Sequence, residues 1–311
     1  MIKNEINIST LSGFSTSNGQ SKPTYTYIDG RPFVVEGNVR SAISLTCGLD
    51  NCDNSKSWTS GSTPSMLENS TVANTIGLEW LQQAEAEHAS IASFARHTLQ
   101  LMSIGASSEL ILRSQRASID EIEHAKMCYG FASKFMEVEI YPGPLDMIGS
   151  LDKLNIEDII ESVIQDGCIQ ETISAIEGHF RAKYTSDEVV KNSLTKLAAD
   201  ETKHAQLAWD TIKWIVEKYP EQELFVSKIF EKELKKEEQR SITKVKNHTK
   251  DICDQSIIEN MLMRYGIPSK SKKDRVRDAA IGDIIKPVYE AGFGDFSSIS
   301  HRITAFNYHE I

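Results

Sequence analysis

The sequence predicts an all-α protein whose centre is a four-helix bundle with one crossover connection. Apolar residues recur at three- and four-residue steps from Thr75 onward, which is the period of an amphipathic helix. The helical stretches between 75 and 219 form two pairs with short internal connections, joined by a longer link. The sequence Asp-Glu-x-x-His-Ala occurs twice there, 80 residues apart. We therefore divide the chain into an N-terminal extension (1–74), the bundle (75–219) and a helical C-terminal extension (220–311).

The N-terminal extension is rich in Ser, Thr, Asn and Gly and has little helical period. Within it, residues 24–36 predict a short β-hairpin, because Asp29-Gly30 supplies a turn between two β-prone runs. The rest of this extension, notably residues 55–65, is expected to be loop or poorly ordered.

Turn and cap residues bound the helices of the bundle. Gly105 ends the first helix and Ser107-Ser108 caps the second, and the short connection predicts antiparallel packing. A break near Tyr141 precedes the third helix, and Pro220 stops the fourth. The expected helices are 75–103, 107–138, 156–184 and, after Thr185–Asp187, a fourth to about Tyr219; the C-terminal extension adds a charged helix to about Asn247, a helical stretch near 254–264, a basic linker and an amphipathic segment near 274–290.

Composition excludes several classes of protein. The 311 residues are 40% hydrophobic and 25% charged, enough for one substantial core. A formal net charge of −10 argues against a nucleic-acid or anionic-membrane surface, and the basic run Lys270–Arg277 is too short to change this. No apolar stretch approaches the roughly 20 residues of a transmembrane helix, and the first residues lack the apolar run of a signal peptide. We therefore expect a cytoplasmic protein without nucleic-acid or membrane partners.

The five cysteines are widely scattered in a chain too large to need disulfides, so we expect reduced thiols. Cys47 and Cys52, four residues apart in a polar loop, could hold a metal or form a disulfide. Without a second Cys or His pair beside them, an incidental loop is the better interpretation.

The repeated motif places a Glu and a His on the same side of each of two helices, because residues three apart on a helix point the same way. Three- and four-residue steps through Glu121 and His124 meet Ala117, Cys128 and Phe131, so both polar groups interrupt an apolar stripe. Glu201 and His204 interrupt a similar stripe, and so do Glu87 and Glu171 on the two remaining helices. Each of the four carboxylates therefore lies on a face that should be buried.

Four buried carboxylates close together would be prohibitively costly unless cations compensate them. Two divalent ions carry four positive charges, which balances four carboxylates and two neutral imidazoles. The alternative is a solvated acidic face or a metal-free structural network of buried Glu and His. The charge balance favours a two-metal site.

The chemistry of these ligands indicates the metal. Carboxylate and imidazole ligands without thiolate suit iron or manganese and leave coordination positions open, whereas a closed zinc site would favour sulfur. Neither His-Glu-x-x-His nor a phosphate-binding loop occurs in the sequence.

Glu87, Glu121 with His124, Glu171, and Glu201 with His204, on four successive helices, resemble the ligand set of the ferritin-like di-iron carboxylate proteins. The resemblance covers residues 75–219. The segments 86–96 and 166–172 also look like a group of uncharacterised bacterial ferritin-like proteins. The resemblance to the di-iron carboxylate proteins implies that Glu87, Glu121 and His124 serve one iron and that Glu171, Glu201 and His204 serve the other. It also makes Glu121 and Glu201 candidate bridges.

Several neighbours of these residues have alternative roles. Glu85 is the alternative to Glu87, and His88 is expected beside the site or on the surface. In related sites an Asp such as Asp120 or Asp200 hydrogen-bonds a ligating His, but a surface position is equally compatible. We expect Cys128 and Cys168 to pack as small buried hydrophobic residues. The alternative is that they line the metal cavity. Packing rather than a radical relay is also expected for Tyr129 and Trp209, which lie off the ligand face.

The leading functional hypothesis is an enzyme: a non-haem di-iron oxygenase or oxidase that uses O2 to hydroxylate, desaturate or N-oxygenate a small organic substrate. It would need two Fe ions (or Mn), O2 as co-substrate and an external electron donor, and it could form a homodimer. The two extensions favour this class, because they could cover the bundle and form a substrate pocket. The alternatives are a ferroxidase or iron-handling protein, a di-manganese peroxide-detoxifying protein, and a metal-free scaffold.

Overall fold

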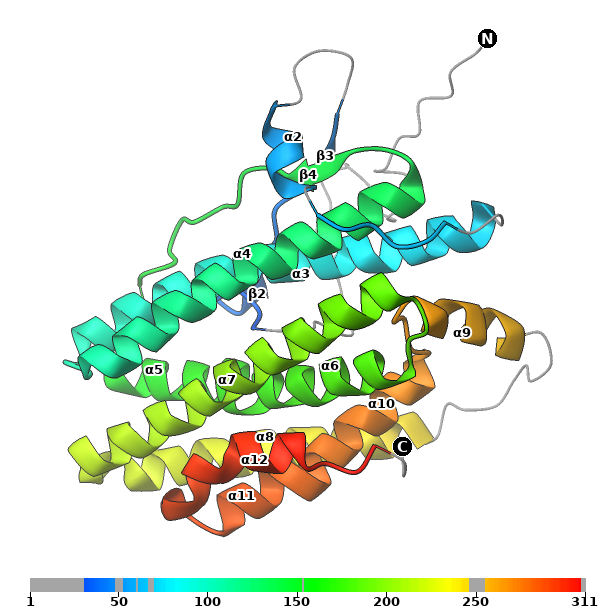
Figure 1. The fold of residues 1–311 in the computed structure, drawn as a ribbon. Coiled ribbons are helices and arrows are strands. Elements are labelled where there is room, and N and C mark those ends of the chain that lie inside the picture. The colour runs from blue at the N-terminus through cyan, green and yellow to red at the C-terminus, as the bar shows by residue number, and fades with distance from the viewer. Residues whose placement is uncertain are drawn as a thin grey trace.

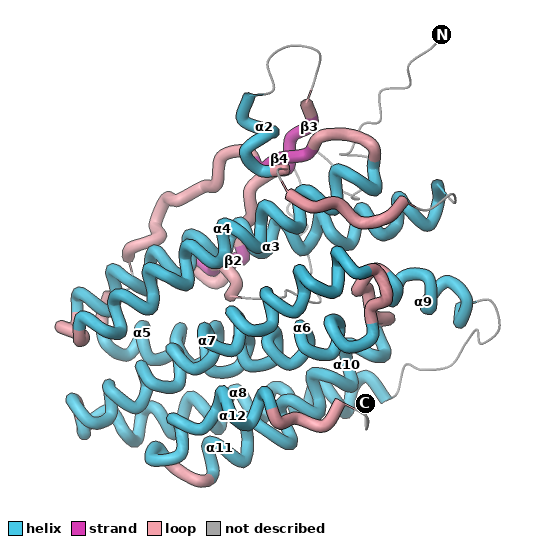
Figure 2. The backbone as a smooth tube through the Cα atoms, in the orientation of Figure 1, coloured by secondary structure: helices cyan, strands magenta, loops and turns pink. Residues whose placement is uncertain are grey.

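The computed structural model describes residues 31–47, 53–59, 61–66, 70–152, 154–245 and 255–308. Helices dominate this part of the chain, and its strands form two short two-stranded sheets (Figures 1 and 2). The protein is therefore mostly helical, as the sequence predicts. No helix in the described ranges has both the length and the apolar character needed to cross a membrane.

Four long helical segments form the centre of the molecule, and we call them the four-helix core (Figure 1). Helices α3 and α4 pack closely along their length as one antiparallel pair, and the third segment packs on α7 as the other. The third segment is continuous but changes type, because its middle turns form a π-helix. Its bounds and those of the other core helices are α3 (Ser70–Ser103), α4 (Ser108–Met136), α5 (Ile156–Ser162), η1 (Val163–Glu171), α6 (Thr172–Tyr184) and α7 (Glu188–Lys218).

Short polar side chains begin three of these helices, as expected of N-caps. Ser107 accepts a hydrogen bond from the Leu110 amide, Asn155 from Asp158, and Asp187 from Val189 and Val190. Glu137, with φ of 54°, ends α4 in the left-handed region. The predicted helix bounds are confirmed to within a few residues, except that α3 begins at Ser70 rather than Thr75.

The link between the two pairs, residues 137–155, runs back along the four-helix core from the end of α4 to the start of α5 (Figure 1). Its strand β4 (Ile140–Pro142) pairs antiparallel with β3 (Ser44–Thr46), so the N-terminal extension is joined to the end of the first helix pair. The short helix α2 (Asp53–Trp58) packs beside them. The expectation of loop throughout residues 55–65 was therefore wrong for the residues that belong to α2.

The hairpin predicted at residues 24–36 is only partly open to comparison, because residues 24–30, with the Asp29-Gly30 turn, lie outside the described residues. Val34–Val35 (β1) does form a strand, but it pairs with Asn38–Val39 (β2). The turn is made by Glu36 and Gly37, with φ of 51° and 75°. Two positive-φ residues suit a tight hairpin turn, which explains why this Glu-Gly pair closes the hairpin.

The C-terminal extension packs against the outer face of the second helix pair, α5 to α7 (Figure 1). Its core residues include Phe230 and Phe296, which enclose Trp209 of α7. The basic run from Lys270 is helical rather than a linker, so that expectation was wrong. The elements are η2 (Pro220–Gln222), α8 (Glu223–Val245), α9 (Gln255–Arg264), α10 (Lys270–Ala279), η3 (Ala280–Ile285), α11 (Lys286–Glu290), η4 (Phe293–Ser298) and α12 (Ile299–Thr304).

Two cysteines of the four-helix core, Cys128 and Cys168, are fully buried thiols outside any disulfide, as expected. Cys47 is disulfide-bonded, which corrects the expectation that all the thiols are reduced. The loop position of Cys47 leaves its side chain free to meet another sulfur, whereas the two core cysteines are held by their helices. Cys52 and Cys253 lie outside the described residues.

Candidate metal centre

All six side chains that the sequence singled out as ligands meet inside the four-helix core. They come from different segments, with Glu87 on α3, Glu171 at the end of η1, and a Glu-x-x-His pair on each of α4 and α7. Each is at most 3% exposed. The burial of six polar side chains in an apolar core requires a compensating partner. The residues are Glu87, Glu121, His124, Glu171, Glu201 and His204.

Two overlapping groups of four residues could each hold a metal ion. Glu87 and His124 belong to one group, Glu171 and His204 belong to the other, and Glu121 and Glu201 belong to both. Within each group the ligand atoms lie within 4.8 Å of one another. The two shared carboxylates are those expected to bridge two ions.

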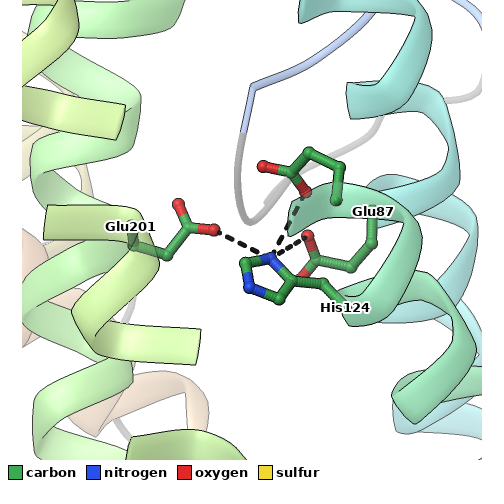
Figure 3. A group of neighbouring side chains, drawn as sticks. Glu87, His124 and Glu201 are labelled. Carbon is green, nitrogen blue, oxygen red and sulfur yellow. Dashed lines mark ion pairs between the residues drawn. The ribbon is translucent and has the colours of Figure 1, made fainter. Parts of the chain in front are cut away.

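The two imidazoles face the carboxylates with the same ring nitrogen. His124 Nδ1 lies 3.3 Å from Glu201 Oε1 and 3.5 Å from Glu121 Oε2 (Figure 3). His204 Nδ1 lies 3.1 Å from Glu121 Oε1 and 3.7 Å from Glu201 Oε1. Each His is thus nearer to the shared Glu of the opposite helix than to that of its own motif, so the centre exists only where α4 and α7 pack together.

The Asp that precedes each motif Glu faces the His of the other motif. Asp120 Oδ2 lies within hydrogen-bond distance of His204 Nε2, at 3.4 Å, and Asp200 Oδ2 lies 3.5 Å from His124 Nε2. A carboxylate at Nε2 fixes the proton there and leaves Nδ1 free to bind a cation. Asp120 and Asp200 therefore orient the imidazoles, and Asp200 is nearly buried.

The ionisation of the cluster shows how strongly the charges interact. Burial and the neighbouring Glu121 carboxylate raise the pKa of Glu87 well above its usual range, and burial and Glu201 do the same to Glu171. Burial alone would lower the pKa of both imidazoles, but the surrounding carboxylates outweigh it and raise the pKa of His124 and His204. Without a cation, protons must occupy this cluster, which is the behaviour expected of ligands that exchange protons for metal.

Two side chains outside the ligand set, Gln83 and Arg181, position Glu87 through successive hydrogen bonds. Gln83 Nε2 donates to Glu87 Oε1 at 3.1 Å, and Arg181 Nη2 donates to Gln83 Oε1 at 2.6 Å. Arg181 also lies over the Trp80 ring and donates to the Gly266 carbonyl. One Glu87 oxygen is thus held by an amide, while Oε2 has no hydrogen-bond partner among the described residues.

The second half of the centre is positioned by a close helix contact. Gly167 of η1 packs so closely on α7 that an added Cβ would lie 2.5 Å from Ala208 Cβ. Gly167 is four residues before Glu171, and Ala208 is four residues after His204. The π-helix, a form frequent at functional sites, ends at Glu171 itself.

Glu85 and His88, the neighbours of Glu87, lie outside the two groups. Glu85 accepts a hydrogen bond from Ser44 Oγ at 2.8 Å, and burial raises its pKa. His88 packs against the Trp58 ring, with ring centroids 5.3 Å apart. The choice of Glu87 over Glu85 therefore agrees with the geometry.

The sulfur and aromatic residues also stay outside the two groups. Burial raises the pKa of the Cys168 thiol well above its usual range, which keeps it protonated. Tyr129 packs against Trp58, and its hydroxyl lies 3.4 Å from Ser44 Oγ. Trp209 donates to Thr172 Oγ1 at 3.1 Å. Tyr129 and Trp209 pack as expected.

Two cavities approach the centre from outside. One, of about 220 Å³, lies between residue 59, residues 61–63, α4 and α7, and His124 forms part of its wall. The other, of about 230 Å³, lies between residues 32–41, α3 and residues 267–273, and Gln83 forms part of its wall. The N- and C-terminal extensions thus both line the second cavity, beside the amide that holds Glu87.

Gln83 and Arg181 were not singled out from the sequence. Gln83 lies one helical turn before Glu87, and that spacing is the signal that could have found it. The contact of Arg181 is 98 residues away in sequence, so no local pattern marks it.

Nothing matches this chain among protein-family models, curated proteins or solved structures. The functional argument therefore rests on the geometry of the site.

Proposed function

We propose that this chain is a ferritin-like di-iron carboxylate protein and acts as an O2-dependent oxidoreductase on a small organic substrate. The observation that carries the proposal is the pair of overlapping four-residue groups that share Glu121 and Glu201. One Glu from each of two helices and a Glu-x-x-His pair from each of two others is the ligand pattern of that family.

The donor set fits two divalent ions of this kind. Four carboxylates balance the four charges, and imidazole with carboxylate ligation suits iron and also manganese. Two iron ions held there would supply the activation of O2. Around them, Glu121 and Glu201 would each contact both ions, the Nδ1 atoms of His124 and His204 would each bind one, and Glu87 and Glu171 would complete the two ends.

The groups around the ligands hold protons in place. Asp120 Oδ2 lies within hydrogen-bond distance of His204 Nε2, Asp200 Oδ2 lies 3.5 Å from His124 Nε2, and Gln83 donates to one oxygen of Glu87. Phe94 packs against the His204 ring and shields that side of the centre from water. Transfer of one oxygen atom to a substrate leaves the other to be reduced to water by two further electrons, so such a reaction needs an external donor.

An organic substrate is supported by the cavity that residues 32–41, α3 and residues 267–273 enclose, since iron storage needs no such covering. The cavity that reaches His124 supports the second candidate, a ferroxidase or peroxide-detoxifying protein, because its polar wall gives ions a route to a ligand.

Metal analysis tests the centre. After reconstitution with ferrous iron or Mn²⁺ we expect close to two ions per chain, and Glu121→Ala/Glu201→Ala should abolish binding because it removes both shared carboxylates. The matched control is Glu109→Ala/Glu217→Ala, which removes two exposed carboxylates from the same two helices. Retention of two ions by the first double variant would refute the assignment.

Oxygen uptake separates the classes of function. An oxygenase should consume O2 in its ferrous form, and organic candidates should accelerate the uptake. Accumulation of ferric mineral without that acceleration would indicate iron handling, and rapid loss of peroxide from the Mn²⁺ form would indicate detoxification. A chain that binds no stoichiometric metal would be a scaffold.

A further inference from the structure

Arg31 enters the four-helix core from the segment that leads into the first hairpin. Its carbonyl accepts a hydrogen bond from Ser90 Oγ at 2.9 Å, and the Val34 carbonyl accepts one from Arg96 Nη1. Ser93 Oγ donates to the Pro32 carbonyl at 3.4 Å. Three side chains of α3 thus hold the backbone of this segment by hydrogen bonds. The fixed backbone determines the direction of the Arg31 side chain.

The guanidinium of Arg31 is buried beside the candidate metal centre. The residue is 1% exposed, and its guanidinium carbon lies 5.0 Å from the centroid of the Phe94 ring. The Phe94 ring in turn lies 4.9 Å from the ring of His204. On another side Arg31 faces Gly167, where a Cβ would lie 3.8 Å from Nη1. Arg31 therefore lies between α3 and the π-helix, one ring away from a ligand.

None of the three guanidinium nitrogens of Arg31 has a hydrogen-bond partner among the residues that the structure describes. A buried charge without partners costs several kcal/mol at least, so such an arrangement calls for a missing anion. Burial lowers the pKa of Arg31, while the carboxylates of Asp166 and Glu171 act to raise it. The two carboxylates act on the Arg31 charge electrostatically but do not hydrogen-bond to its guanidinium.

The local charges leave a positive excess. Arg96, the second buried guanidinium here, is tied to the Val34 carbonyl and the Phe33 ring rather than to an acid. Asp166 is the carboxylate outside the ligand set that acts on both arginines. Once Glu171 is neutralised by metal, two guanidinium charges face one carboxylate, and a monoanion restores the balance.

His97 adds a neutral donor to the same region. It is fully buried, and neither ring nitrogen has a hydrogen-bond partner within the described part of the chain. Burial, Arg31 and Arg96 lower the pKa of His97 well below its usual value, so its imidazole is neutral and offers one N–H. An unsatisfied imidazole and an unsatisfied guanidinium in one apolar region are what a small oxygen-bearing anion would satisfy together.

We propose that Arg31, with His97 of α3 as a second donor, binds the carboxylate of a small organic acid next to the metal centre. The inference rests on the proposed function and names the class of its substrate. The planar fork of a guanidinium matches the two oxygens of a carboxylate. A single excess charge favours a monocarboxylate over a dianionic phosphate.

The test is calorimetric titration of the Mn²⁺-loaded, full-length protein with acetate and benzoate, and with acetamide, benzamide and phosphate for comparison. We expect the two carboxylates to bind and the amides and phosphate to bind more weakly. Arg31→Met should weaken carboxylate binding about tenfold or more, since charge-assisted hydrogen bonds are lost, and Arg31→Lys should lose less. Lys191→Met is the control, because Lys191 is an exposed cation of α7 that lines neither cavity.

Melting curves and metal content show whether Arg31→Met is folded. If it is not, carboxylate binding is measured with Arg31→Lys instead. Carboxylate binding that Arg31→Met leaves intact would overturn the inference, as would preferred binding of phosphate. A protein that holds two ions but binds no carboxylate would overturn the anion site alone. Carboxylate binding through Arg31 in a chain that holds no metal would support the anion site and overturn the proposed function instead.

Discussion

Replacement of Gly167 by alanine should disturb the metal centre more than the fold. The added Cβ would lie 2.5 Å from Ala208 Cβ, whereas carbon atoms in contact prefer roughly 3.5–4.0 Å. The π-helix and α7 must therefore separate by about 1 Å at this point. Gly167 and Ala208 are each one turn from a ligand, so the separation is carried directly to Glu171 and His204.

The effect of Gly167→Ala on the free energy of unfolding should be small compared with its effect on metal affinity. Overpacking of this kind costs about 1–3 kcal/mol, and alanine returns about 0.5–1 kcal/mol through its better helical propensity. The free energy of unfolding should thus fall by no more than about 2.5 kcal/mol. Functional sites tolerate displacements of about 0.5 Å, so a shift of about 1 Å should lower metal affinity sharply.

The assay is metal content by elemental analysis, with denaturant unfolding of the same samples. Gly167→Ala should hold fewer than two ions, and Gly167→Ala/Ala208→Gly should recover them because the second change removes the clashing methyl. Gly282→Ala is the control, since Gly282 also lies in a π-helix but has no neighbour within 4 Å of an added Cβ. Unchanged metal affinity in Gly167→Ala would refute the reasoning.

Two further predictions concern charged pairs. Asp120→Asn and Asp200→Asn should each weaken metal binding about 10–100-fold in chelator competition, because the imidazoles lose their orienting carboxylates, and equal affinities would contradict this role. In the C-terminal extension, Arg277 donates to both oxygens of Glu237, at 2.8 and 2.6 Å. Burial raises the pKa of Glu237 but Arg277 outweighs it, so the folded value is depressed and the pair stabilises the fold above the unfolded pKa of about 4.3. Glu237→Gln should lower the melting temperature at pH 7, and the difference should vanish as the pH falls through the folded pKa; a difference that persists at pH 2 would count against the pair, with the exposed Glu238→Gln as control.

The four helices of the core could be predicted because local rules determine them. Periodic apolar residues, the caps Ser107 and Asp187, and Pro220 all act within a few residues of where they stand. That the six side chains of the candidate centre face the core could be predicted for the same reason, since helical spacing fixes the direction of each side chain. Glu121 and Glu201 needed no knowledge of the tertiary structure beyond the packing of their apolar faces.

Features that depend on distant contacts could not be predicted. The close packing of Gly167 in the π-helix on α7 joins residues far apart in sequence, and Arg31 is buried from a segment with no periodic pattern. The Asp29-Gly30 turn is a strong local signal, yet β1 pairs across Glu36 and Gly37, because either dipeptide can close a hairpin. Local preference leaves such a choice to tertiary contacts.

The crossed pairs between α4 and α7 make each motif incomplete by itself. The first hairpin carries Asp120 and His124, the second carries Asp200 and His204, and each Asp serves the His of the other. A helical hairpin in isolation would hold half of the carboxylates and an imidazole with no orienting partner. Metal occupancy would therefore depend on how one helix pair packs against the other. Any ligand, partner or mutation that shifts the two pairs would lower metal occupancy before the helices themselves unfold.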